Sequence, residues 1–135
     1  MALQHSTDVR NAMLDAIEAT IGTSAVLKIR TGSAPATCAT ADSGTVLATL
    51  SLPSDWMAAA SGGTKAKSGT WQDLTADNSG TAAHYRIYES TGTTCKEQGT
   101  VTVTGGGGDM TLDSVSFTAG QSFTINTYTL TAPGA

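Results

Sequence analysis

Residues 25–30 read AVLKIR, and here the spacing of hydrophobic residues along the chain changes from four to two. Ala25, Leu27 and Ile29 fall on one side of an extended backbone, whereas the residues between them fall on the other. This alternation is typical of a β-strand with one buried face. The stretch therefore marks the point at which a helical pattern ends and a β pattern begins.

Upstream of this strand, the chain has the pattern of an amphipathic helix. Val9, Met13, Ile17 and Ile21 recur every four residues and form one apolar stripe. A serine precedes the pattern at a position typical of an N-cap, and a glycine follows it at a position typical of a C-cap. We therefore expect an α-helix over residues 7–21.

Downstream, period-two segments recur, for example over 45–52, 83–90 and 99–104, and turn-forming residues rather than helical patterns separate them. Short strands at this spacing predict an all-β fold, an antiparallel β-sandwich of jelly-roll-like type preceded by one N-terminal α-helix. The expected units are an N-terminal amphipathic helix over 1–22 and a β-sandwich domain over 23–135.

The composition excludes several classes of function. Ala, Gly, Ser and Thr fill more than half of the 135 positions, only 13% of residues are charged, and the net charge is −4. A negative chain is a poor partner for phosphates, so we expect no nucleic acid partner. No apolar run reaches the length of a membrane span, so we expect no membrane partner. The N-terminus lacks the apolar core of a signal peptide, which predicts assembly in a cytoplasm.

The two cysteines, Cys38 and Cys95, form neither a zinc set nor a CxxC redox pair. We expect two reduced thiols, with a disulfide formed outside the reducing cell as the alternative.

The run Gly105–Gly108 lies within VTVTGGGGDMTLDSVSF, residues 101–117. A phosphate-binding loop needs Lys and Ser or Thr after the glycines and a helix beyond them, whereas here Asp109 and a strand pattern follow. The run therefore predicts a flexible hairpin connection without a ligand, and a shorter Asn-Gly turn in its place is expected to preserve the fold.

No set of residues indicates catalysis or a cofactor. His84 is expected on the solvent face of its strand, no nucleophile-elbow sequence occurs, and the acidic residues are dispersed. We therefore expect no enzyme activity, no metal and no cofactor. Trp56 and Trp71 suit the core, a protein interface or a carbohydrate surface. The candidate residues for a protein interface are Val9, Met13, Ile17, Ile21, Trp56 and Met57.

Segments spread over nearly the whole chain, among them VRNAMLDAIEATIG (9–22), HYRIYESTGTTC (84–95) and GQSFTINTYTLTAPG (120–134), resemble a family of small virion proteins of tailed bacteriophages. The resemblance implies a non-enzymatic capsid component, a head decoration or cement protein of β-sandwich type. It supplies no functional residue that can be transferred by position.

The expected function is therefore a capsid decoration protein on the exterior of a phage virion. It would bind the major capsid protein, self-associate as a dimer or trimer and stabilise the shell after assembly in the host cytoplasm. One alternative is a tail, collar or connector component of the virion. A further alternative is a glycan-binding surface module that uses Trp56 and Trp71.

Overall fold

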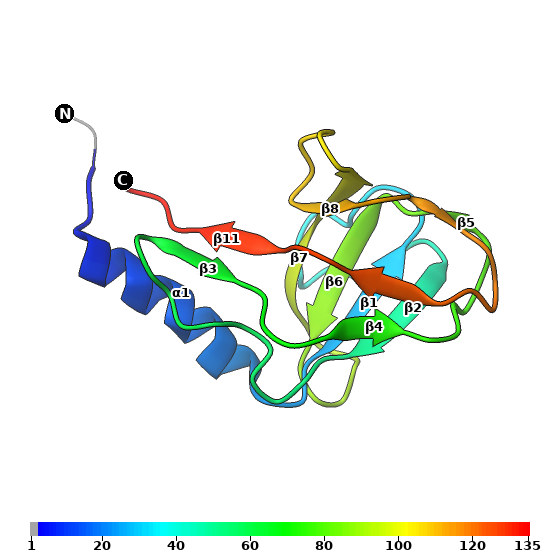
Figure 1. Cartoon of the computed structure of the whole chain (residues 1–135), viewed down its shortest axis with the longest axis horizontal. Coiled ribbons are helices and arrows are strands. Elements are labelled where there is room, and N and C mark those ends of the chain that lie inside the picture. Colours follow the sequence, from blue (N-terminus) through cyan, green and yellow to red (C-terminus); the bar gives the residue numbers. More distant parts are fainter. Residues whose placement is uncertain (1–2) are drawn as a thin grey trace.

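One helix precedes eleven strands in the computed structural model, which describes residues 3–135 (Figure 1). The elements are α1 (Thr7–Ile21), β1 (Val26–Arg30), β2 (Val46–Ser51), β3 (Thr64–Ala66), β4 (Trp71–Asp73), β5 (Gly80–Thr81), β6 (His84–Tyr88), β7 (Cys95–Val103), β8 (Met110–Leu112), β9 (Ser116–Phe117), β10 (Phe123–Ile125) and β11 (Thr129–Thr131). The predicted all-β fold with an N-terminal helix is confirmed. Residues 1 and 2 of the expected helical unit lie outside the described residues.

Helix α1 has the bounds that the sequence predicts, with Ser6 at the N-cap position and a backbone cap at Gly22. Ser6 is the N-cap residue and has an extended backbone, but its hydroxyl donates to the Asp8 carboxylate instead of accepting from a backbone N–H. That bond is the main reason why the pKa of Asp8 is lowered. At the other end, the Gly22 N–H donates to the Glu18 carbonyl at 2.9 Å, with a φ of 95° that favours glycine.

A five-stranded sheet in the order β2-β1-β6-β7-β8 forms the centre of the fold. Strand β1, which contains most of AVLKIR, pairs antiparallel with β2 on one side and with β6 on the other. Leu27 and Ile29 are fully buried, as their period-two spacing predicts. The hydrophobic stretch that decides the β pattern therefore lies inside the sheet.

Three two-stranded sheets, β4–β10, β5–β9 and β3–β11, complete the β structure. Strand β4 lies beside β2, where the Asp73 carboxylate accepts from the Thr49 N–H at 3.0 Å and closes part of that edge. Trp71 on β4, Ile125 on β10 and Phe117 on β9 pack in the same core as Leu27. The β layers therefore share one core, whereas the jelly-roll order of strands stays a prediction.

The glycine run does not form a hairpin, and the prediction of an antiparallel connection there is wrong. Strands β7 and β8 pair in parallel, with Val101 opposite Met110, so the connection must return to the start of the pairing before β8 begins. The Gly108 N–H donates to the Thr102 hydroxyl at 2.9 Å, and the Asp109 carboxylate accepts from the Thr100 N–H at 3.0 Å. A two-residue turn cannot make this return, so an Asn-Gly replacement is now expected to break the β7–β8 pairing.

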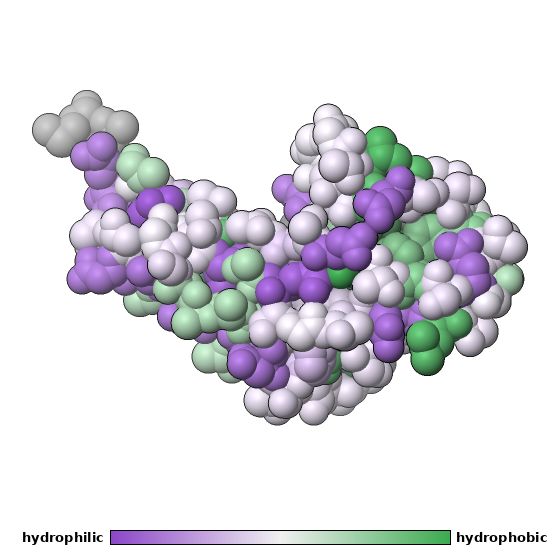
Figure 2. All heavy atoms as spheres, in the orientation of Figure 1, coloured by the Kyte–Doolittle hydropathy of each residue, from purple (hydrophilic) through white to green (hydrophobic). Residues whose placement is uncertain are grey.

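Helix α1 and the ribbon β3–β11 extend together from one end of the sheet and form an arm (Figure 1). In the space-filling view the molecule is hollowed between this arm and the β body (Figure 2). Among residues 3–135, no helix is both long and apolar enough to span a bilayer. Both candidate binding surfaces described below are lined by elements of this arm.

Candidate binding surfaces

Helix α1 is attached to the ribbon through its charged side. The ammonium group of Lys65 on β3 lies 2.7 Å from Asp15 and 3.0 Å from Glu18, and the Lys65 side chain is only 2% exposed. Burial alone would lower the pKa of Lys65, but its hydrogen bonds to the two carboxylates outweigh burial and raise the pKa. The same groups line a cavity of about 510 Å³ beside the helix, where their charges are already paired with one another.

Two further side chains of α1 hold the opposite end of the ribbon. The Arg10 guanidinium donates to the Ala132 carbonyl at 3.0 Å, and the Asn11 carbonyl oxygen accepts from the Gly63 N–H at 2.9 Å. Gly63 has a φ of 79°, which favours glycine, and a side chain here would have to displace the Arg10 guanidinium. The helix thus docks through its charged and polar residues, together with the buried Leu14.

The apolar stripe of α1 turns gradually from solvent into the core. Val9 is 43% exposed, Met13 is 37% exposed, Ile17 is half-buried and Ile21 is 5% exposed. A helix advances about 100° per residue, so each four-residue step rotates the stripe by about 40°. The spacing of four therefore leaves the first half of the stripe at the surface. Leu14, three residues before Ile17, lies on the buried side of the helix. The spacing of four did not predict its burial.

The exposed half of the stripe borders an open groove of about 300 Å³. Met13, Ala16, Ile17 and Thr20 line the groove from the helix, and Lys96 of β7 lines it from the sheet. The wall that α1 contributes is mostly apolar. This groove and the neighbouring Val9 form the surface that we call the α1 face.

Three of the predicted interface residues lie in the core instead. Trp56 is fully buried, Met57 is 1% exposed and Ile21 is 5% exposed, so none of them can contact a partner in this conformation. The Trp56 indole N–H donates to the Gly22 carbonyl at 2.9 Å, just where α1 leaves the body. Trp71 is also fully buried, and its ring centroid lies 5.9 Å from that of Trp56. The carbohydrate surface that required both tryptophans is therefore contradicted.

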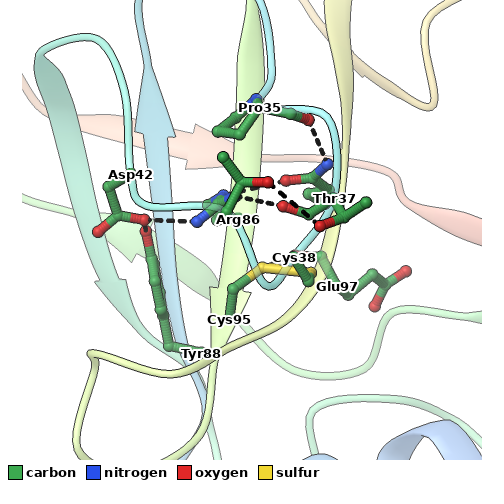
Figure 3. Close-up of a disulfide and its surroundings, with 10 residues drawn as sticks. Pro35, Thr37, Cys38, Asp42, Arg86, Tyr88, Cys95 and Glu97 are labelled. Carbon is green, nitrogen blue, oxygen red and sulfur yellow. Dashed lines mark hydrogen bonds and ion pairs between the residues drawn. A yellow bond between two sulfur atoms is a disulfide. The ribbon is translucent and has the colours of Figure 1, made fainter.

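The cysteines form a disulfide, so the expectation of two reduced thiols is wrong. The bond between Cys38 and Cys95 ties the loop over residues 31–45 to the start of β7, with the two Cα atoms 5.2 Å apart (Figure 3). The loop covers the face of the sheet opposite the main core. The sequence could not reveal this pairing, because 57 residues separate the two thiols.

Beneath this loop, Arg86 is held in a network of hydrogen bonds that reaches Asp42 at the surface (Figure 3). Arg86 of β6, which is 2% exposed, donates to Asp42 at 2.8 Å, to the Thr37 carbonyl at 3.0 Å and to Gln98 at 3.0 Å. The Tyr88 hydroxyl donates to Asp42 at 2.7 Å. Burial alone would raise the pKa of Asp42, but the bonds from Tyr88 and Arg86 lower it. Arg86 and Tyr88 are covered by this loop, whereas Tyr85 and Ile87 belong to the hydrophobic core, so both faces of β6 are buried.

His84 belongs to the same covered face, and its predicted position on the solvent face is wrong. Its ring is fully buried, with Nδ1 2.6 Å from the Gly32 carbonyl and Nε2 without a partner. Burial lowers the pKa of His84, the hydrogen bond to Gly32 opposes this effect, and the positive charges of Arg30 and Arg86 add to it. The neutral ring therefore donates from Nδ1.

We expect the free energy of unfolding to fall as the pH drops from about 7.5 to 5.5, because unfolded histidine gains a proton near pH 6.5. The folded state resists this proton, so the slope approaches at most about 1.4 kcal/mol per pH unit. Urea unfolding at a series of pH values measures the slope. In His84→Asn, which keeps a donor toward Gly32, the slope should flatten. An unchanged slope in this variant would contradict the assignment.

Comparison of the chain with protein-family models, with curated proteins and with solved structures finds no match. Among the described residues, no group of three or more His, Cys, Asp or Glu side chains is placed to hold a metal ion. The function must therefore be argued from the surfaces themselves.

Proposed function

We propose that this chain is a non-enzymatic structural protein of a tailed-phage virion, a decoration protein that binds the major capsid protein on the exterior of the capsid. The resemblance of its segments to small virion proteins supports the virion assignment. The α1 face supports the mode of contact. Neither argument calls for a bound cofactor.

The observation that carries the proposal is the exposed apolar half of α1. In most surface helices the apolar side is buried and the charged side faces water. Here Asp15 and Glu18 are engaged with the ribbon through Lys65, whereas Val9 and Met13 remain at the surface. Since the helix lies on an arm, a neighbouring shell subunit can reach this face without displacing the β body.

A face with two half-exposed side chains gives only a weak contact in a single copy. A shell presents many identical sites, and contacts between neighbouring decoration proteins add to each of them, so modest contacts sum to a stable layer. Self-association as a dimer or trimer belongs to this proposal. The docked helix also loses little conformational entropy on binding, because the Arg10 and Lys65 contacts already order it.

The test begins with the virions of the phage that encodes the chain. Quantitative mass spectrometry should find the chain at a copy number comparable with that of the major capsid protein. A chain absent from purified virions would refute the proposal. A chain present in only a few copies per particle would favour the tail, collar or connector alternative.

Charged substitutions on the α1 face should then weaken binding to shells prepared without the chain. The double variant Val9→Asp with Met13→Asp is expected to bind at least about tenfold more weakly, because each carboxylate loses water in an apolar contact. The measurement is co-sedimentation with the shells, together with the increase in their melting temperature. The matched control is Val103→Asp, since Val103 is 45% exposed but lies far from α1 in sequence, on β7. Equal binding by both variants would place the contact elsewhere.

A further inference from the structure

A second surface lies in the hollow between the arm and the β body (Figure 2). The cleft there has a volume of about 460 Å³. Strand β11 forms one wall, and the opposite wall contains Glu97, Gln98 and Asp109. No Lys or Arg lines the cleft. Its position separates it from the α1 face, whose groove is lined by α1 and Lys96.

The wall formed by β11 is an open strand edge. The Lys67 N–H donates to the Tyr128 carbonyl at 2.9 Å, and the Ala132 N–H donates to the Gly63 carbonyl at 3.0 Å. In an antiparallel pair, hydrogen-bonding residues alternate along each strand, so Tyr128, Leu130 and Ala132 face β3. The backbone N–H and C=O groups of Thr129 and Thr131 therefore point away from β3 and into the cleft.

The other edge of the ribbon is already covered. On the far side of β3, the Ala58 N–H donates to the Ala66 carbonyl at 2.8 Å, and Met57 forms a bridge with Lys67. Only the β11 edge remains free to pair with an incoming strand. A free edge is a template for β-strand addition, in which backbone bonds supply affinity and side-chain pockets supply specificity.

The opposite wall carries Glu97, a carboxylate of which one oxygen has a hydrogen-bond partner and the other has none among the described residues. The Tyr128 hydroxyl donates to Glu97 Oε1 at 2.7 Å, and the Tyr85 hydroxyl lies 2.5 Å from that of Tyr128. The second oxygen, Glu97 Oε2, is buried and has no hydrogen-bond donor. Burial raises the pKa of Glu97, the bond from Tyr128 opposes this effect, and the charge of Asp109 adds to it. A cation placed in the cleft would favour the ionised form of this carboxyl.

We propose that the cleft binds an extended segment of another protein, which adds as a strand to the free edge of β11 and places a Lys or Arg side chain against Glu97 and Asp109. Three residues of β11 span roughly 10 Å, so a partner segment of about four to six residues fills the edge. The acidic wall selects the positive charge. The inference adds a site to the proposed function and does not depend on the partner being a capsid protein.

A second copy of this chain is a poorer occupant. Pairing two β11 edges would bring the acidic walls of two copies together, and each copy carries a net charge of −4. The like charges of the two acidic walls would repel each other. The charge of the cleft therefore favours a different protein with a basic segment.

The test uses the full-length chain labelled with ¹⁵N and two synthetic peptides, acetyl-TVKVTV-amide and acetyl-TVEVTV-amide. Titration with the lysine peptide should shift the backbone amide signals of Thr129, Thr131 and Gly108. The lysine peptide should bind about tenfold more tightly than the glutamate peptide at low salt, and the preference should shrink as salt is added. Equal affinities, or no shift at Thr129 and Thr131, would overturn the proposal.

Two variants separate the edge from the charge. Thr131→Pro removes one outward N–H and leaves the bonds to β3, so it should abolish binding of both peptides. Glu97→Gln keeps the acceptor for the Tyr128 hydroxyl but removes the charge, so it should abolish most of the preference for lysine. Leu74→Asp, at a residue that is 66% exposed and does not line the cleft, serves as the control and should bind like the wild type.

If Thr131→Pro fails to fold by circular dichroism, the Glu97→Gln result decides alone, and an unchanged lysine preference overturns the proposal. A wild-type chain that dimerises in light scattering, together with a monomeric Thr131→Pro, would identify a second copy as the occupant and also overturn it.

Discussion

The double variant Cys38→Ser with Cys95→Ser removes the disulfide. It is expected to lower the free energy of unfolding by about 2–4 kcal/mol. The bond joins positions 57 residues apart, and a cross-link of that length strongly restricts the unfolded chain. The loop should still dock in the native state, because Arg86, Asp42 and Tyr88 keep their hydrogen bonds. Urea unfolding of the wild type and the double variant measures the difference.

The reductant provides the control. Adding a phosphine reductant should move the urea midpoint of the wild type toward that of the double variant and leave the double variant unchanged. If the reductant has no effect on the wild type, and both thiols of the folded chain react with a thiol reagent before it is added, then Cys38 and Cys95 are not bonded in solution.

The second large effect is expected for Trp71→Ala, which should cost about 3–5 kcal/mol. The Trp71 ring is fully buried between Trp56 and Tyr128, with ring centroids 5.9 Å and 5.6 Å away. Its indole N–H donates to the carbonyls of Trp56 and Ser68, both at 3.1 Å. The substitution therefore removes a large apolar volume and the indole donor of the Ser68 carbonyl, whereas the Trp56 carbonyl still accepts from the Ser68 N–H. Thermal unfolding followed by near-ultraviolet circular dichroism measures the loss.

A neighbouring exposed residue serves as the matched control. Leu74 is 66% exposed, so Leu74→Ala should change the free energy of unfolding by no more than about 0.5 kcal/mol. If Trp71→Ala were as stable as Leu74→Ala, then Trp71 would not be a core residue, and a surface role for the tryptophans would have to be considered again.

Local patterns in the sequence were sufficient for α1, for the longer strands such as β1, β2 and β6, and for the fold class, but they did not indicate the short strands β3, β4 and β5. The apolar spacing and the C-cap glycine Gly22 indicate the bounds of α1, because they depend only on neighbouring residues. The alternation in AVLKIR gives β1 its buried face for the same reason. Each of these signals lies within a few residues of the structure that it specifies.

Contacts between segments that lie far apart in the chain could not be predicted from the sequence and are visible only in the tertiary structure. The exposed start of the α1 stripe depends on which side of the helix meets Lys65, 50 residues beyond Asp15. The burial of His84 depends on a loop that closes over β6, and the open edge of β11 depends on its pairing with β3, a strand from the middle of the chain.

By itself, the sequence determined the bounds of α1, the position of the longer strands and the apolar face of β1. Periodicity and caps encode these properties over a few residues, and backbone geometry converts them directly into structure. Only the tertiary structure decided which apolar and charged groups remain exposed. That outcome depends on contacts between residues far apart in the chain, such as Cys38 with Cys95 and Glu97 with Tyr128. Local sequence patterns do not encode such contacts.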